Sequence, residues 1–175
     1  MNDATRAQLR LIAEIAVALD AAGIPWWLFG GWAMDFHAHE VTRDHEDIEL
    51  FVRTEDGARV RETFTRAGFA APPGLHPDEG QPFVKDGQEV GAWFIARDAA
   101  GRMVTPGRWS NWPWPDGAFD GSRALLGDLE VPVMSAAGLL DMKLGFAKHP
   151  HGAPLRAKDI ADIGRLRGII AAEAG

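Results

Sequence analysis

IPWWLFGGWAMDFHAHEVTRDHEDIELFV, residues 24–52, is the stretch of this sequence that decides the fold. Bulky uncharged residues over 26–29 predict a buried strand. The pair Gly30-Gly31 then releases the backbone into a short helix over 32–38, and a polar turn leads to a second strand over 46–52. Backbone N–H groups at a helix start bind phosphate, so the glycine pair indicates a site for a polyphosphate.

The second strand carries two acidic residues, Asp47 and Glu49. Strand side chains alternate, so residues two apart point to the same face and can share one cation. Ile48, Leu50 and Val52 occupy the other face, which we assign to the core, and the acidic pair is therefore expected to look outward. Acidic residues are depleted from strands, so the pair is consistent with a metal site for Mg²⁺. A solvated strand face is the alternative.

The remaining periodicity predicts an α+β fold with a mixed sheet, in which strands and helices come first and two helices close the chain. A length of 175 residues predicts a single domain over 1–175, with the C-terminal helices from about residue 136 closing the site. Helices are expected over 3–22, 54–67, 136–147 and 155–170; strands over 83–84, 89–96, 102–104, 125–127 and 129–134; and loops over 71–82 and 108–121.

Composition narrows the functional class. Hydrophobic residues make up 46% and charged residues 25%, which is typical of a globular protein. A net charge of −7 argues against general nucleic-acid binding. No membrane span is expected, because Glu14 and Asp20 interrupt the apolar N-terminal segment, and the absence of cysteine fits a cytoplasmic location.

Other residues are weaker candidates on their own. Arg43 could meet a phosphate with its planar guanidinium, although a charged turn explains it equally well. Lys143 and Lys158, one on each C-terminal helix, are either phosphate ligands or solvated side chains. Glu89 is expected as an exposed residue beside a turn. The tryptophan-rich loop over 108–121 either walls a ligand pocket or anchors itself in the fold.

The histidines raise a third possibility, a zinc-dependent hydrolase. His37, His39 and His45 lie close in sequence, and Asp47 could add an oxygen ligand. However, His37 and His39 are two apart at an expected helix end, so they should point in different directions.

GGWAMDFHAHEVTRDHEDIEL, residues 30–50, resembles the motif of the nucleotidyltransferase fold in its aminoglycoside and lincosamide antibiotic branch. In that branch a GGWA-D segment, a TR-x-H turn and a D-x-D pair follow in this order. LEVPVMSAAGLLDMKLGF, residues 129–146, and LRAKDIADIGRL, residues 155–166, are similar to its closing portion, with a lysine on each of two helices. The resemblance covers residues 24–167.

This resemblance implies a nucleotidyltransferase-like mixed β-sheet flanked by helices and an adenylyltransferase-like reaction. An NMP group would pass from ATP or another NTP to a hydroxyl of a small molecule, such as an aminoglycoside or lincosamide antibiotic, with Mg²⁺ as cofactor. Carried over position by position, the implied roles are nucleotide binding by Gly30, Gly31, Arg43, Lys143 and Lys158, and magnesium binding by Asp47 and Glu49.

The sequence departs from the family pattern at two of the three acidic positions. Glu49 stands where the family usually has aspartate, and Gly91 stands where a third carboxylate is expected on a later strand. Glu89 shares the strand face of residue 91 and could replace that acid, although its side chain starts about 7 Å away along the strand. The alternative function is therefore a catalytically degenerate fold that acts as a ligand-binding or protein-interaction module.

Overall fold

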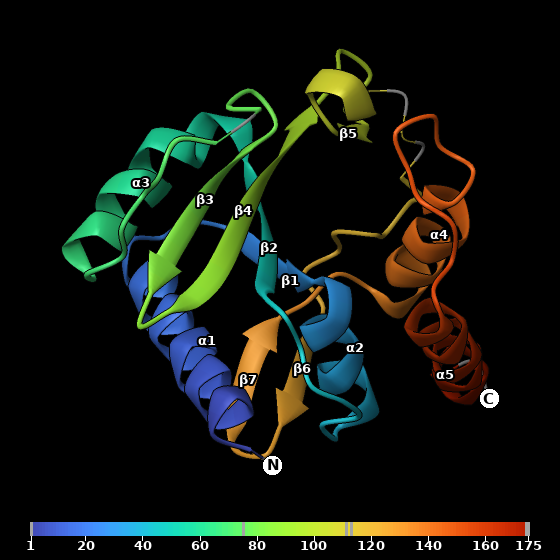
Figure 1. Ribbon diagram of the computed structural model, residues 1–175. Coiled ribbons are helices and arrows are strands. Elements are labelled where there is room, and N and C mark those ends of the chain that lie inside the picture. The colour runs from blue at the N-terminus through green and yellow to red at the C-terminus, as the bar shows by residue number, and fades with distance from the viewer. Residues whose placement is uncertain (1, 75, 111, 113, 174–175) are drawn as a thin grey trace.

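A mixed sheet flanked by helices forms the centre of the computed structural model, which describes residues 2–74, 76–110, 112 and 114–173 (Figure 1). The helices are α1 (Asp3–Ala21), α2 (Gly30–Ala38), α3 (Gly57–Arg66), α4 (Ala136–Phe146) and α5 (Ala157–Glu173), with 3₁₀ turns η1 (Thr54–Asp56) and η2 (Gly107–Trp109). The strands are β1 (Trp26–Phe29), β2 (Ile48–Arg53), β3 (Gly80–Lys85), β4 (Gln88–Arg97), β5 (Met103–Val104), β6 (Arg123–Leu126) and β7 (Leu129–Pro132). The predicted α+β fold is confirmed.

The strand order is β1-β2-β4-β3, with β5 paired to the far end of β4. Strands β2 and β4 run parallel, joined by a crossover through α3, and the β1–β2 and β3–β4 pairs are antiparallel. In this register Phe29, Glu49 and Gly91 lie side by side on neighbouring strands. The hairpin of β6 and β7 joins the edge of the sheet through a bridge between Leu28 and Val133.

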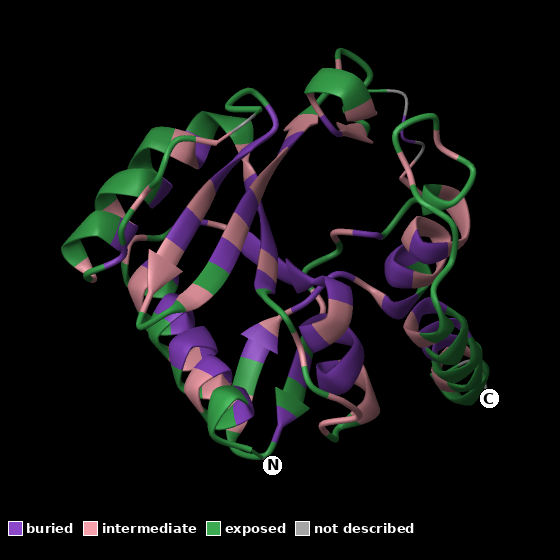
Figure 2. Cartoon of the chain, in the orientation of Figure 1, coloured by how far each residue is buried: buried purple, intermediate pink, exposed green. Residues whose placement is uncertain are grey.

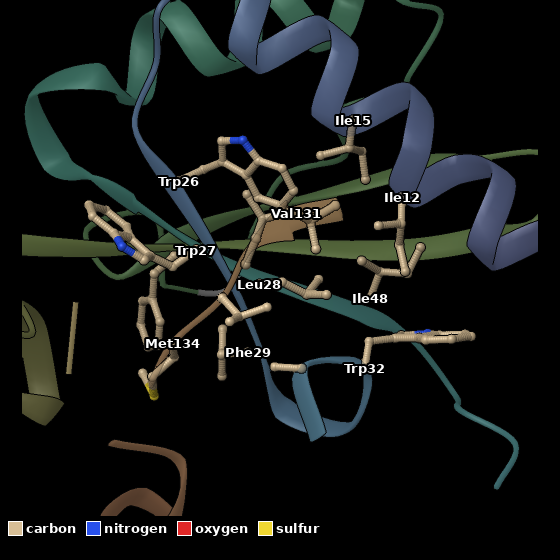
Figure 3. Close-up of a cluster of buried hydrophobic side chains, with 14 of the residues drawn as sticks. Ile12, Ile15, Trp26, Trp27, Leu28, Phe29, Trp32, Ile48, Val131 and Met134 are labelled. Atoms are coloured by element: carbon tan, nitrogen blue, oxygen red, sulfur yellow. The ribbon is translucent and has the colours of Figure 1, made fainter. Parts of the chain in front are cut away.

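Helix α1 covers one face of the sheet. Its N-cap is Asn2, whose side chain accepts a hydrogen bond from the Thr5 N–H at 2.8 Å. The apolar stripe of α1 is fully buried, and Ile12 and Ile15 point toward the strand residue Ile48 (Figure 3). Each such side chain contributes about 1.5–3 kcal/mol through burial. The inward side of α1 is accordingly buried and its outer side exposed (Figure 2).

The opposite face of the sheet is also covered, which corrects the expectation of an outward-facing acidic pair for Glu49, whereas Asp47 is exposed. Phe51, on the face of Glu49, is 5% exposed and stacks on Phe29 with ring centroids 4.1 Å apart. Trp114, from the tryptophan-rich segment, meets Phe51 edge to face at 5.5 Å. Glu49 therefore faces the interior of a site and not bulk solvent.

Several element boundaries differ from those expected. Strand β3 begins at Gly80, inside the expected loop over 71–82, because its backbone pairs with β4. Asp47 precedes β2 instead of lying within it. On α5, Ile160 follows the helical period but is 61% exposed. Residues 75, 111 and 113 of the expected loops lie outside the described residues.

Within the described ranges, no helix combines the length and hydrophobicity that crossing a membrane requires.

Candidate active site

A polar cavity of about 270 Å³ lies where the start of α2, the turn before β2, and helices α4 and α5 meet. The structure brings together seven of the eight residues predicted for the site, which come from four separate parts of the chain. The predicted residues that line this cavity are Gly30, Gly31, Arg43, Asp47, Glu49, Lys143 and Lys158. The motif at residues 30–49 and the lysines of the C-terminal helices therefore lie around one cavity.

The glycine pair opens α2 at the wall of this cavity. Gly30 has a φ of +70°, and a Cβ there would lie 2.5 Å from Oε2 of Glu49. A Cβ on Gly31 would lie 2.7 Å from the Arg43 guanidinium. Phe29, the N-cap residue, makes no side-chain cap, so it leaves the first N–H groups of α2 uncapped. Such a helix start favours an anion.

Two carboxylates stand beside this helix start. Burial, together with the charge of Asp47, raises the pKa of Glu49 to about 7. Burial and the neighbouring charge of Glu46 raise the pKa of Asp47 as well. Two neighbouring carboxylates whose pKa values are both raised are stabilised by a shared cation, and hard oxygen ligands suit Mg²⁺. The residues present therefore fit a magnesium ion.

Lys143 and Arg43 both pair with Asp162, a buried acid of α5. The Lys143 ammonium, on a residue that is 8% exposed, lies 2.9 Å from Oδ2 of Asp162 and 3.3 Å from Oδ1 of Asp159. The same Asp162 oxygen lies 3.4 Å from Nη2 of Arg43. Buried cations need such partners, because an unpaired charge away from water costs several kcal/mol. Asp162 thereby fixes both cations at the cavity wall.

A second network holds the turn before β2 against α2. Nε2 of His45 lies 2.6 Å from Oδ2 of Asp35, which is fully buried on α2. The Thr42 hydroxyl donates to the other Asp35 oxygen at 2.5 Å, and Arg43 Nη1 lies 3.0 Å from His45 Nδ1. The Trp32 ring packs on His45. The TR-x-H turn is thus anchored on α2, and this anchorage orients Arg43 toward the cavity.

The entrance of the cavity carries further cations. Lys158 Nζ lies 3.3 Å from Oε1 of Glu46. Arg156, which the sequence reasoning missed, also lines the cavity and lies 2.8 Å from Asp159. Although burial raises the pKa of Asp159, hydrogen bonds from Arg156 hold that pKa well below its ordinary value. The signal for Arg156 was its place two residues before Lys158 in the motif over 155–166.

Glu89 is the predicted site residue that lines neither this cavity nor the neighbouring one described below. Glu89 is exposed on β4, and its negative charge contributes to the raised pKa of Asp47. Gly91, the next residue on that strand face, is the register partner of Glu49. The structure therefore puts Glu89 beside Asp47, and Gly91 beside Glu49.

A second cavity of about 240 Å³, called here the aromatic cavity, adjoins the polar one and shares Glu49 with it. Its walls include Trp109, Trp112 and Trp114 from the predicted loop over 108–121. The described tryptophans of that loop therefore line a cavity, while Trp112, which is 6% exposed, and Trp114, which packs on Phe51, also anchor the segment in the fold. Glu49 lines both cavities and stands at their junction together with Phe29, Met142 and Phe146.

The histidines do not converge on a zinc site. Ring nitrogens of His37 and His39 lie 2.8 Å from the carbonyl oxygens of Met134 and Leu125, whereas His45 faces Asp35. In the part of the chain that the structure describes, no three His, Asp or Glu side chains form a group able to hold a metal ion. The hydrolase alternative therefore has no ligand set among these residues.

Comparison with known families places this geometry in context. The sequence model described as aminoglycoside-2''-adenylyltransferase matches residues 11–166. Curated 2''-aminoglycoside nucleotidyltransferases from Klebsiella pneumoniae and Escherichia coli are each 46% identical to the chain over 43 residues. These 43 residues span 25% of this chain and 24% of each relative. The match to these relatives is therefore limited to about a quarter of their length.

Solved structures share the fold. The solution structure of the antibiotic-resistance factor ANT(2'')-Ia aligns with a TM-score of 0.77 at 20% identity, over 96% of this chain and 86% of that one. A crystal structure of ANT(2'')-Ia with adenylyl-2''-tobramycin gives 0.75 at 20% identity, over 96% and 92%. The lincosamide antibiotic adenylyltransferase LnuA, bound to lincomycin, gives 0.69 at 19% identity, over 96% and 99%.

Proposed function

Because the chain belongs to the aminoglycoside-2''-adenylyltransferase family, we propose that it transfers an NMP group from ATP or another NTP to a hydroxyl of a small molecule in the aminoglycoside or lincosamide class. The observation that carries this proposal is the meeting of two cavities at Glu49. The polar cavity has a helix start, cations and two carboxylates, and it suits a magnesium-bound triphosphate. The aromatic cavity is left for the acceptor.

Nucleotide binding follows from the groups around the polar cavity. The N–H groups at the start of α2, beside Gly30 and Gly31, donate to phosphate oxygens. Lys158 and Arg43 supply positive charge at the wall. Asp47 and Glu49 would hold Mg²⁺, which when bound neutralises the charge that develops on the phosphate oxygens.

The transfer itself is an in-line displacement. The oxygen of the acceptor hydroxyl forms a bond to the α-phosphorus, the bond from that phosphorus to the bridging oxygen breaks, and pyrophosphate leaves with the bonding electrons. The hydroxyl proton passes to a water molecule, because Glu89, the other candidate base, lines neither cavity. Holding the acceptor and the nucleotide in adjoining cavities contributes to the rate by fixing their orientation.

The degenerate-module alternative is not favoured. It rests on the combination of Glu49 and Gly91, whereas the polar cavity retains a carboxylate pair, the glycine helix start and a set of cations.

Calorimetric titration of a non-hydrolysable ATP analogue, with and without Mg²⁺, tests the nucleotide site. We expect magnesium-dependent binding that is lost in Asp47→Ala and retained in Asp128→Ala, a matched change of an exposed acid in the turn between β6 and β7. Asp47→Ala should keep the thermal unfolding temperature of the wild type, because Asp47 is exposed. Unchanged magnesium-dependent binding in Asp47→Ala would falsify the assignment of that residue.

Pyrophosphate release in the presence of hydroxylated antibiotics tests the reaction. Release that needs both an NTP and an acceptor, and that disappears in Asp47→Ala, is the expected result. Binding of the nucleotide without release for any acceptor would instead favour the degenerate module.

A further inference from the structure

The aromatic cavity has a composition that selects among acceptors, and this inference rests on the proposed function. Aromatic and other apolar side chains form most of its wall, from β1, β2 and β4, from the segment around Trp112, and from α4. Edge-to-face and tilted contacts at 5.5 Å join Trp112 to Trp114 and Trp114 to Phe51. Rings fixed in this way present flat apolar surfaces to a ligand.

The charged groups of this wall are nearly all matched within the protein. Of the described residues that line it, Glu49, Glu79 and Arg108 are charged. The Glu79 side chain is 4% exposed, and Arg108 engages both of its oxygens, through its backbone N–H at 2.8 Å and through Nε at 3.0 Å. Glu79 therefore has no oxygen left without a donor, and its charge is neutralised.

The indole N–H groups of the wall offer no acceptor. The Trp93 N–H faces the Glu49 carboxylate, and Nε1 of Trp112 is buried by protein atoms with no hydrogen-bond partner among the described residues. An indole N–H can only donate and gives no partner to an ammonium group, which also only donates.

A ligand with several ammonium groups would bury charge here with Glu49 as the one carboxylate, among the described lining residues, that Arg108 does not already pair. An unpaired buried ion costs several kcal/mol even after relaxation. A cavity of about 240 Å³ also accommodates only a part of a large antibiotic, such as one ring with its substituents. We propose that the acceptor presents a ring with an apolar face and at most one positive charge to this cavity, with the reacting hydroxyl at Glu49.

Calorimetric titration of lincomycin, which has one basic nitrogen, and tobramycin, which has several, tests this proposal on the wild-type protein. The titrations are made with and without Mg²⁺ and the ATP analogue, so that a failure of the nucleotide site is seen separately from a failure of acceptor selection. We expect lincomycin to bind at least tenfold more tightly than tobramycin. Tighter binding of tobramycin, or binding of neither up to about 1 mM, overturns the proposal.

Two variants report on the wall itself. Trp109→Ala should weaken lincomycin binding by about two- to tenfold through loss of a stacking surface, whereas Val17→Ala, an exposed apolar residue of α1, should leave it unchanged. Arg108→Gln removes the guanidinium that pairs with Glu79, so the Glu79 carboxylate becomes available to an ammonium group. This variant should therefore bind tobramycin severalfold more tightly, with little effect on lincomycin binding. Thermal unfolding verifies that each variant is folded. No change in either affinity in the folded Trp109→Ala and Arg108→Gln variants contradicts the proposal.

Discussion

Glu49 on β2 lies directly beside Gly91 on β4, and the space over Gly91 is taken by the indole of Trp93. A Cβ at residue 91 would lie 2.7 Å from Nε1 of that indole, closer than real Cβ atoms come to other atoms. The Trp93 N–H also favours the ionised form of Glu49 and so lowers its pKa against the larger effect of burial. A donor thus stands where a third carboxylate would be expected.

Gly91→Asp alone should not raise turnover, although it restores the acidic pattern. The new side chain must displace the Trp93 indole, and such overpacking lowers the free energy of unfolding by about 1–3 kcal/mol. The double variant Gly91→Asp/Trp93→Ala opens the space and should exceed Trp93→Ala alone in kcat. Initial rates of pyrophosphate release, measured beside thermal unfolding of all three variants, make the comparison. A gain in Gly91→Asp alone would contradict the assigned role of Trp93.

The glycine pair gives a second prediction. Gly30→Ala should lower the free energy of unfolding by about 1–3 kcal/mol, because it places a side chain in the left-handed region and against Glu49. It should also weaken nucleotide binding. Gly164→Ala is the control, since that glycine lies in α5 with open space around it and should become more stable by about 0.5–1 kcal/mol. Chemical denaturation measures both, and a neutral Gly30→Ala would refute the steric argument.

Asp162 gives a third prediction. Asp162→Asn keeps the shape of the side chain but leaves Lys143 and Arg43 without the carboxylate they share, which should cost about 3–5 kcal/mol of stability. Asp116→Asn, an exposed acid outside both cavities, should have no measurable effect. Urea denaturation with equal m-values for the two variants makes the comparison valid. Equal stability of both variants would mean that the buried charges find other partners.

Local patterns account for the parts of the site that the sequence predicted. Gly30 and Gly31 are visible as a break between an apolar strand and a helix, and Asp47 and Glu49 as acidic residues two apart. These patterns involve residues that are neighbours in the sequence, so they can be recognised without the structure. Lys143 entered through the resemblance, since a lysine on a helix is by itself no signal.

Residues whose roles depend on distant partners were not found. Asp162 pairs with Arg43 across 119 positions in the sequence, and Glu79 meets Arg108 across 29. Glu79 lay in a segment without periodicity, which was expected as a surface loop. The prediction that Glu49 faces solvent was wrong for the same reason. Trp114 and its neighbours, which are distant from Glu49 in the sequence, cover that face of the sheet.

The raised pKa of Glu49 gives two further predictions. Its pKa rises from 4.5 to about 7 on folding, so between these values the folded protein holds a proton that the unfolded chain has released. The free energy of unfolding should therefore fall as pH rises from about 5 to about 7. Glu49→Gln removes this dependence and should be the more stable protein at pH 8 without Mg²⁺, by up to about 3 kcal/mol.

Magnesium-dependent nucleotide binding should show the opposite pH dependence. The proton on Glu49 must leave before that carboxylate can hold a cation, so the apparent affinity should weaken by up to tenfold per pH unit below about 7. Calorimetry of the ATP analogue between pH 5.5 and 8.5 measures this, and Asp128→Ala serves as the control with an unchanged profile. A pH-independent affinity in the wild type, with a Glu49→Gln variant that binds equally well, would remove Glu49 from the magnesium site and leave Asp47 as the proposed ligand.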